Sequence, residues 1–308
     1  VNPYNWQDHI HDKNRPENLD FLRRFRALLD EYPGSTAVGE VGDSQRGMEI
    51  QAQYTSGGDK VHMCYSFEFL SGPRPDAPQI AAALQRFEAV GGDGWACWAF
   101  SNHDVMRHAS RWGLDEPAQR LHLALLLSLR GSVCLYQGEE LGLGEAELDF
   151  ADLRDPYGIR FWPKFRGRDG CRTPMVWEAD APNGGFSRAM PWLPVAREHL
   201  AHAADAQADD PGSMLAFYRR MLAFRHRHPV LARGALEVVE ARAGYLALIR
   251  ALDRERMFCA FNLSGTGQAM TLPPGDWRDA AAPFNAPQGG MLGPWQAHFA
   301  HEMARGSV

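Results

Sequence analysis

Acidic side chains stand at three places where a short apolar run of the chain gives way to a polar loop. They are Glu40, Asp104 with its neighbour His103, and the pair at residues 139–140. A carboxyl group can donate or accept a proton, and an imidazole can hydrogen-bond a polar ligand, so these residue types suit acid–base chemistry. The alternative for each is a structural role, because acidic residues also cap helices or form ion pairs where a helix begins.

The elements that must position these groups form a regular alternation. Short apolar runs, rich in small or β-branched residues, are typical of strands buried on both faces. Helical spacing of apolar residues predicts helices that begin near Pro16, Asp76 and Glu116. Strand, loop and helix in turn predict an α/β fold with a parallel sheet and right-handed crossovers. The predicted strands are residues 35–41, 61–67, 95–101 and 132–136.

The second half of the chain has a different pattern. Residues 138–211 lack periodicity and are dense in Gly, Pro, Asp and Trp, and a loop of that length is usually functional. A helix over residues 213–226 follows and is stopped by Pro229. Short alternating runs beyond residue 234 predict a small antiparallel β domain. We therefore expect domains at residues 1–234 and 235–308, with a substrate loop at about 138–211 in the first.

Composition limits the partners. The net charge is -6 over 308 residues, with no run of basic residues, so neither a nucleic acid nor a membrane is expected to bind. A neutral ligand is the better expectation. No apolar stretch is long enough to span a bilayer and no signal peptide is visible, which suggests a cytoplasmic location. Five cysteines without a paired spacing predict no disulfide framework, and Cys64, Cys97 and Cys134 are expected to be buried thiols.

Four motifs occur in order along the chain. They are AVGEV at residues 37–41, FSNHD at 100–104, YQGEELG at 136–142 and GRDGCRTPM at 167–175. In order and spacing they resemble motifs of the α-glucosidases of glycoside hydrolase family thirteen, in the α-amylase superfamily. The resemblance covers essentially the whole chain. It implies the second half of a (β/α)8 TIM barrel, followed by a small antiparallel β domain.

The resemblance implies a role for each polar group. Glu40 matches the general acid/base, which protonates the glycosidic oxygen and later activates water, and which partial burial helps to keep protonated. Asp104 matches the acid that holds sugar hydroxyls, and His103 would hydrogen-bond the same sugar. Arg172 resembles the arginine that closes the glucose pocket. The alternatives are a core histidine for His103 and a salt bridge to Asp169 for Arg172.

Two further residues are candidates for binding the leaving sugar. Asp43 lies on the loop after the first predicted strand, and Phe67 lies at the end of the second. Both loops should open onto the same edge of the sheet, where chemistry is located in β/α barrels.

One required group is missing from the chain. A retaining glycosidase needs two carboxylates about 5 Å apart, an acid/base and a nucleophile. The family's nucleophile lies in a motif of the DGFRLD kind before the acid/base, and no such motif precedes Glu40. A barrel also needs eight strands, and four are predicted. The resemblance therefore implies an N-terminal half as a partner, supplied by a separate chain, by a nicked chain, or by a part of the protein outside this sequence.

The resulting expectation is an exo-acting α-glucosidase. It would release glucose from short α-1,4-glucosides such as maltose, with transglucosylation as an additional activity, once the missing half is present. An α-1,6-glucosidase and a glucosyl-transferring isomerase remain open, as does a non-catalytic sugar-binding or stabilising subunit. No cofactor is expected, and no metal site, because the histidines show no HExxH-like spacing.

Overall fold

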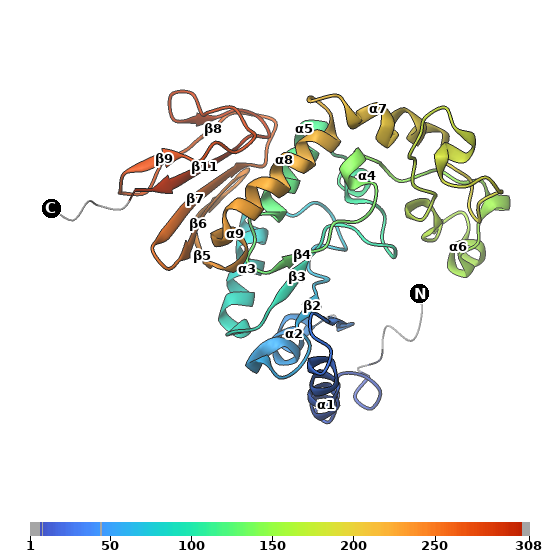
Figure 1. The fold of residues 1–308 in the computed structure, drawn as a ribbon, viewed down its shortest axis with the longest axis horizontal. Coiled ribbons are helices and arrows are strands. Elements are labelled where there is room, and N and C mark those ends of the chain that lie inside the picture. Colours follow the sequence, from blue (N-terminus) through green and yellow to red (C-terminus); the bar gives the residue numbers. More distant parts are fainter. Residues whose placement is uncertain (1–6, 8, 44, 304–308) are drawn as a thin grey trace.

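A four-stranded parallel sheet occupies the middle of the molecule. The computed structural model describes residues 7, 9–43 and 45–303, and Figure 1 shows this sheet between a second sheet on one side and a loop-rich region on the other. The predicted parallel pairing is confirmed, although each strand is shorter than predicted. The strands are β1 (Val38–Glu40), β2 (Met63–Tyr65), β3 (Ala96–Trp98) and β4 (Ser132–Val133).

Helices connect these strands. Helix α3 begins where Asp76 and Gln79 form a reciprocal capping box, and helix α5 begins where the carboxylate of Asp115 accepts the N–H of Ala118. Helix α2 was not predicted, because its buried side chains include the polar Gln51 and Thr55, which hide the apolar period. The helices up to the fourth strand are α1 (Asn18–Asp30), α2 (Gly47–Thr55), α3 (Ala77–Gly91), α4 (His108–Arg111) and α5 (Glu116–Leu126).

The two faces of the parallel sheet have different surroundings. Cys64, Ala96 and Trp98 point to one face and are at most 1% exposed. Val38 points to the other face and is 54% exposed. The expectation that the first strand is buried on both faces is therefore wrong. Among the described residues β1 is also an edge strand, with a neighbouring strand only on the β2 side.

The predicted burial of the cysteines holds with one exception. Cys64 and Cys97 are buried, as expected, and no cysteine in the described ranges is bonded to another. Cys134 is exposed and the prediction for it is wrong. It lies two residues beyond Ser132, which pairs with Cys97, and so it is on the same open side of the sheet as Val38.

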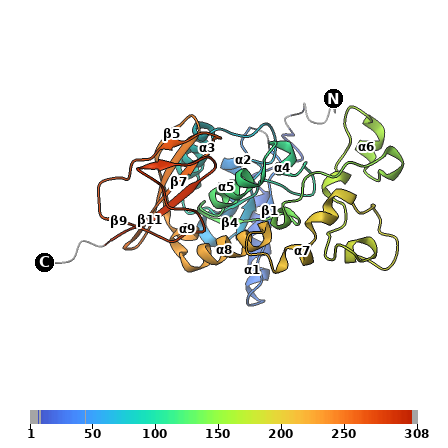
Figure 2. The ribbon, with the colours of Figure 1, turned by 90° about the horizontal axis from the view of Figure 1, so that it is seen from above.

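The long segment after β4 contains short helical turns around a small core of its own. Its core includes Leu141, Leu143 and Val176, and the segment lies at the end of the molecule opposite the C-terminal sheet (Figures 1 and 2). Helix α8 follows, capped by the side chain of Ser213. The helices are α6 (Pro156–Phe161), α7 (Ala204–Ala208), α8 (Met214–Arg227) and α9 (Pro229–Arg233), with 3₁₀ turns at Ser56–Gly58, Glu139–Leu141, Phe150–Asp152, Asp169–Cys171, Pro182–Gly185 and Arg197–His202.

The C-terminal part is the predicted antiparallel β structure. Its larger sheet has the order β5-β6-β7-β11-β9, and β8 pairs with β10. One face of it packs on α8, where Phe224 contacts Phe299 with ring centroids 5.1 Å apart. The buried Arg250 donates hydrogen bonds to the carbonyl oxygens of Leu231 and Gly234 and ties the sheet to α9. The strands are β5 (Ala235–Arg242), β6 (Tyr245–Leu252), β7 (Glu255–Asn262), β8 (Gln268–Ala269), β9 (Trp277–Asp279), β10 (Met291–Leu292) and β11 (Ala297–Glu302).

Candidate active site

Glu40 is the last residue of β1, at the carboxyl edge of the parallel sheet. It pairs in register with Tyr65 of β2, and the hydroxyl of Tyr65 donates to the carbonyl oxygen of Ser101, 3.2 Å away, just after β3. The Glu40 side chain is exposed and has no hydrogen bond or ion pair within the part of the chain that the structure describes. The partial burial expected for this carboxyl is therefore not provided here, because the face of the sheet on which it lies is open.

Asp104 lies in the loop after β3 and is held by two arginines. Its Oδ1 accepts hydrogen bonds from Arg172 Nη2 at 2.7 Å and from Arg168 Nη1 at 2.9 Å. The backbone N–H of Asp104 donates to Asn102 Oδ1 at 2.8 Å, which shapes the loop. Charge-assisted hydrogen bonds from two arginines fix the orientation of this side chain, so Asp104 is arranged to accept hydrogen bonds from a polar ligand.

Arg168 owes its position to a second carboxylate. Its Nε and Nη2 donate to the two oxygens of Asp155, at 3.0 and 2.9 Å, in a bidentate pair. Hydrogen bonding to Asp155 raises the pKa of Arg168, and the same bond lowers the pKa of Asp155. The Asp155 side chain is fully buried. The long loop is thereby fastened to the loop that carries Asp104.

Arg172 and His103 meet at the same loop. Arg172 Nε donates to the carbonyl oxygen of His103 at 2.6 Å, in addition to its bond to Asp104. The alternative salt bridge to Asp169 is not formed, because Asp169 is buried and its Oδ2 accepts the N–H groups of Arg154 and Asp155 instead. The His103 ring is 65% exposed, so the alternative of a core histidine is wrong.

Asp43 and Phe67 line one cavity of about 270 Å³, whose wall also includes Tyr65 and Arg86. Asp43 Oδ1 accepts the N–H groups of residues 45 and 46, just before α2. Burial alone would raise the pKa of Asp43, but these hydrogen bonds outweigh it and the pKa is lowered. Its carboxylate is thus ionised and engaged by the turn before α2, and Phe67, 36% exposed, is the freer of the two for contact with a ligand.

The acidic pair after β4 does not join this group. Glu139 is buried and its Oε1 lies 3.2 Å from His108 Nδ1. Glu140 Oε2 accepts the N–H of Gly138 at 2.7 Å, and burial raises the pKa of Glu140. Glu140 therefore serves the turn that begins the long loop, and Glu139 pairs with the first residue of α4, so both have the structural kind of role considered for them.

The comparison with protein families shows which family the chain belongs to. The family described as "Alpha amylase, catalytic domain" matches residues 2–234. The chain belongs to the α-amylase family. It has the α-amylase superfamily fold, a TIM-barrel fold, together with an antiparallel C-terminal sheet.

Members of the α-amylase family resemble the chain over almost all of its length. A probable α-glucosidase of Rhizobium meliloti (strain 1021) is 59% identical over 277 residues, which are 89% of this chain and 50% of that protein. An oligo-1,6-glucosidase of Heyndrickxia coagulans is 28% identical over 86% of this chain and 54% of its own length. A crystal structure of an α-glucosyl transfer enzyme superposes with a TM-score of 0.91 and 44% identity, over 98% of this chain and 57% of the other. The chain spans about half the length of the relatives it matches.

Sequence reasoning missed two contributors to the site. Arg168 stands in the motif that pointed to Arg172, but nothing in the spacing showed that it pairs with both Asp104 and Asp155. Arg107 is buried and donates to the carbonyl oxygens of Cys171 and Gln137, both at 3.0 Å, so it fixes the base of the long loop. A buried arginine among carbonyl groups has no sequence signal.

No helix in the described ranges is both long and apolar enough to cross a membrane.

Proposed function

We propose that this chain supplies the acid/base and sugar-binding groups of a retaining, exo-acting α-glucosidase that releases glucose from short α-1,4-glucosides. Activity requires an N-terminal half that carries the aspartate nucleophile. One observation carries the proposal: the Asp104 carboxylate, oriented by Arg168 and Arg172, lies after β3 at the edge of the sheet where Glu40 ends β1. The similarity to a probable α-glucosidase supports the choice of substrate class.

The proposed architecture is half of a barrel. In this proposal β1 to β4 are the last four of eight parallel strands, residues 1–234 complete the catalytic domain and residues 235–308 form a separate β domain. The open face with Val38 and Glu40 is then the interior of the barrel, which other strands must cover. The family relatives support this, because the chain matches only about half of their length.

The chemistry assigns two successive proton transfers to Glu40. Its carboxylic acid gives a proton to the glycosidic oxygen while the partner's carboxylate attacks the anomeric carbon and the bond to the leaving sugar breaks. The Glu40 carboxylate then takes a proton from water as that water displaces the enzyme from the same carbon. Each step inverts the anomeric centre, so the product retains its configuration.

The remaining groups position the sugar. Asp104 accepts hydrogen bonds from hydroxyls of the terminal glucose, and His103, exposed beside it, bonds the same sugar. Arg172 closes the pocket behind that glucose, which restricts cleavage to chain ends. The long loop at about 138–211 forms the wall, held by the Arg168–Asp155 pair. Phe67 and Asp43 line the place of the leaving sugar, in the 270 Å³ cavity.

The decisive experiment replaces Glu40 by Gln in the protein assembled with its N-terminal half. We expect maltose turnover to fall by about 10²- to 10⁴-fold, which is the usual contribution of a positioned acid/base. The loss should be smaller on p-nitrophenyl α-glucoside, because nitrophenolate leaves without being protonated. Glu31→Gln, at an exposed residue just beyond α1, is the control. Equal turnover by Glu40→Gln and unmodified enzyme would refute the assignment.

A second activity has support of its own. The 44% identity to an α-glucosyl transfer enzyme favours transfer of glucose to the hydroxyl group of an alcohol in place of water. The products formed from maltose, isomaltose and sucrose, with and without an added acceptor alcohol, separate hydrolysis from transfer and α-1,4 from α-1,6 cleavage. Exclusive cleavage of isomaltose would replace the proposed linkage with α-1,6, and formation of sucrose isomers would identify an isomerase.

A further inference from the structure

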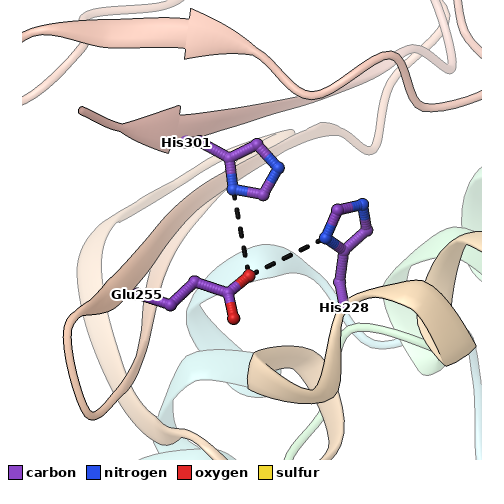
Figure 3. Close-up of side chains that lie close together, drawn as sticks. All are labelled: His228, Glu255 and His301. Carbon is purple, nitrogen blue, oxygen red and sulfur yellow. Dashed lines mark ion pairs between the residues drawn. The ribbon is translucent and has the colours of Figure 1, made fainter. Parts of the chain in front are cut away.

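Two histidines and a glutamate from three separate elements meet where α8 reaches the C-terminal sheet. His228 follows the last residue of α8, Glu255 begins β7 and His301 lies in β11. Their ligating atoms all lie within 4.8 Å of one another. Figure 3 shows both imidazole rings directed at the carboxylate of Glu255. The cluster is remote in sequence from the proposed glycosidase residues and has no role there.

The β-sheet brings two of the three together. His301 pairs in register with Met257 of β7. Glu255 lies two residues before Met257 and therefore points to the same face, as a diagonal neighbour of His301. The residues at 253 and 254 form the tight connection between β6 and β7, where Leu252 pairs with Glu255. The glutamate thus stands at a fixed position of a hairpin.

The helix brings the third. Phe224 and His228 are one turn apart at the end of α8, with ring centroids 4.5 Å apart. The His228 ring also packs against the His301 ring at 4.8 Å, and Phe224 packs against Phe299 of the sheet. This column of rings fixes the direction of both imidazoles before any ligand binds.

The distances between the imidazole nitrogens and the Glu255 carboxylate fit a bound ion between them better than direct hydrogen bonds. Nδ1 of His228 is 3.7 Å from Glu255 Oε1, and Nδ1 of His301 is 3.9 Å from the same oxygen. Both distances exceed a hydrogen bond. Ligand atoms around a tetrahedral Zn²⁺ are about 3.3 Å apart, so a small inward shift of each side chain completes the site. The side chains are 18%, 35% and 29% exposed, which leaves access for an ion and a water ligand.

We propose that His228, Glu255 and His301 bind a divalent transition-metal ion, Zn²⁺ in the first place, with water as the fourth ligand. Two imidazoles and a carboxylate are a donor set that Zn²⁺ takes in proteins. The ion would join the end of α8 to β7 and β11, and so fasten the C-terminal sheet to the rest of the chain. Sequence spacing could not reveal this site, because its ligands are 27 and 46 residues apart.

The test is direct metal binding by the intact, untagged protein after treatment with EDTA and dialysis. Titration calorimetry with Zn²⁺ should show one site per chain, and Co²⁺ should give the strong visible absorption of a four-coordinate ion. His228→Ala, Glu255→Gln and His301→Ala should each weaken Zn²⁺ binding by at least about tenfold. His226→Ala, at an exposed histidine of α8, should bind normally.

Thermal unfolding gives a second readout. Zn²⁺ should raise the Tm of the unmodified protein and of His226→Ala, but not of the three ligand variants, because an ion that binds only the folded state stabilises it. Absence of a saturable one-to-one site would overturn the proposal. So would Zn²⁺ affinity in Glu255→Gln and His301→Ala equal to that of the unmodified protein. These two residues are partly exposed, and both variants should fold even if His228→Ala does not.

Discussion

The covered and open faces of the parallel sheet differ in what they are built to do. On the covered face Trp98 is 1% exposed, packs against Phe69 and Phe87 and donates its indole N–H to the carbonyl oxygen of Arg130. On the open face Val38 is 54% exposed, and Glu40 beyond it has no partner within the described residues. Residues of this chain bury the covered face. The open face has the proposed catalytic residue Glu40, and no described residues pack over Val38 and Glu40 to bury them.

The difference explains the contrast between the two proposed carboxyl groups. Asp104 is held by Arg168 and Arg172, which this chain supplies. Glu40 is exposed and has no hydrogen bond or ion pair within the described residues, so in the proposed enzyme its surroundings must come from the N-terminal half. This chain therefore holds the proposed sugar-binding carboxylate in place, whereas it leaves the proposed acid/base without contacts among the described residues.

The largest expected effect is on the assembled open face. Asp104→Asn in the enzyme with its N-terminal half should lower kcat/KM for maltose by about 10³-fold, because a charged acceptor for sugar hydroxyls is lost and two arginines lose the negative charge that they share. Steady-state kinetics measure this, and the thermal midpoint should change little, since the pair is partly exposed. A variant with full activity would remove Asp104 from the site.

A core substitution tests the covered face. Trp98→Ala should cost about 3 to 5 kcal/mol of unfolding free energy, because it leaves a cavity and an unpaired carbonyl oxygen. Val38→Ala, in the adjoining part of the same sheet, should cost less than about 0.5 kcal/mol in this chain, as expected for an exposed site. Urea unfolding measures both. Similar losses would mean that the two faces are equally covered.

Acid should destabilise the covered side through His122. This buried ring donates from Nδ1 to the carbonyl oxygen of Ala118 at 2.7 Å and packs near Phe100 and Trp112. Burial lowers the pKa of His122 to about 3. The unfolded chain takes up this proton near pH 6.5, so the contribution is complete above that pH and is lost as the pH falls toward 3.

The size of the expected loss of stability follows from the difference between the pKa of His122 in the folded chain, about 3, and its value of about 6.5 in the unfolded chain. Unfolding free energy should fall by about 3 kcal/mol between pH 6.5 and 4 on account of this one residue. His122→Leu should remove that part of the pH dependence, and His226→Leu, on the exposed side of α8, should keep it. Urea unfolding at a series of pH values measures the slope. Parallel slopes in His122→Leu and unmodified protein would contradict the assignment.

Sequence patterns predicted most of the fold because they report local and repeating features. Asp76 marked a helix start, the helix predicted from about Glu116 begins there, and the parallel sheet followed from the alternation of elements. The burial of β1 and of Cys134 was predicted wrongly, since a strand's composition does not show whether a neighbour exists to cover it. Helix α2 was missed because Gln51 is buried by a hydrogen bond to the carbonyl oxygen of Cys64.

The site was predicted less completely, for a related reason. Motifs located Asp104 and Arg172, but their contact is between residues 68 positions apart. The bidentate pair of Arg168 with Asp155 and the meeting of His228 with His301 depend on how loops and sheets pack, which spacing along the chain does not encode. The family resemblance predicted what Asp104 and Arg172 do, and the structure added the side chains that hold them in place.

Val38→Lys should have little effect on the folding of this chain and a large effect on its assembly with the N-terminal half. Val38→Lys places a charge on the exposed strand β1, where lysine discourages pairing with another strand. In this chain by itself the unfolding free energy should change by less than about 0.5 kcal/mol, because the side chain is solvated. If the open face is a barrel interior, the same lysine must be desolvated when the N-terminal half binds, so co-purification and recovered glucosidase activity should both decline. Val38→Ile keeps the apolar character and should assemble normally. Normal assembly of Val38→Lys would show that β1 stays at an open surface, and the proposed half-barrel would then be wrong even with Asp104 and its arginines in place.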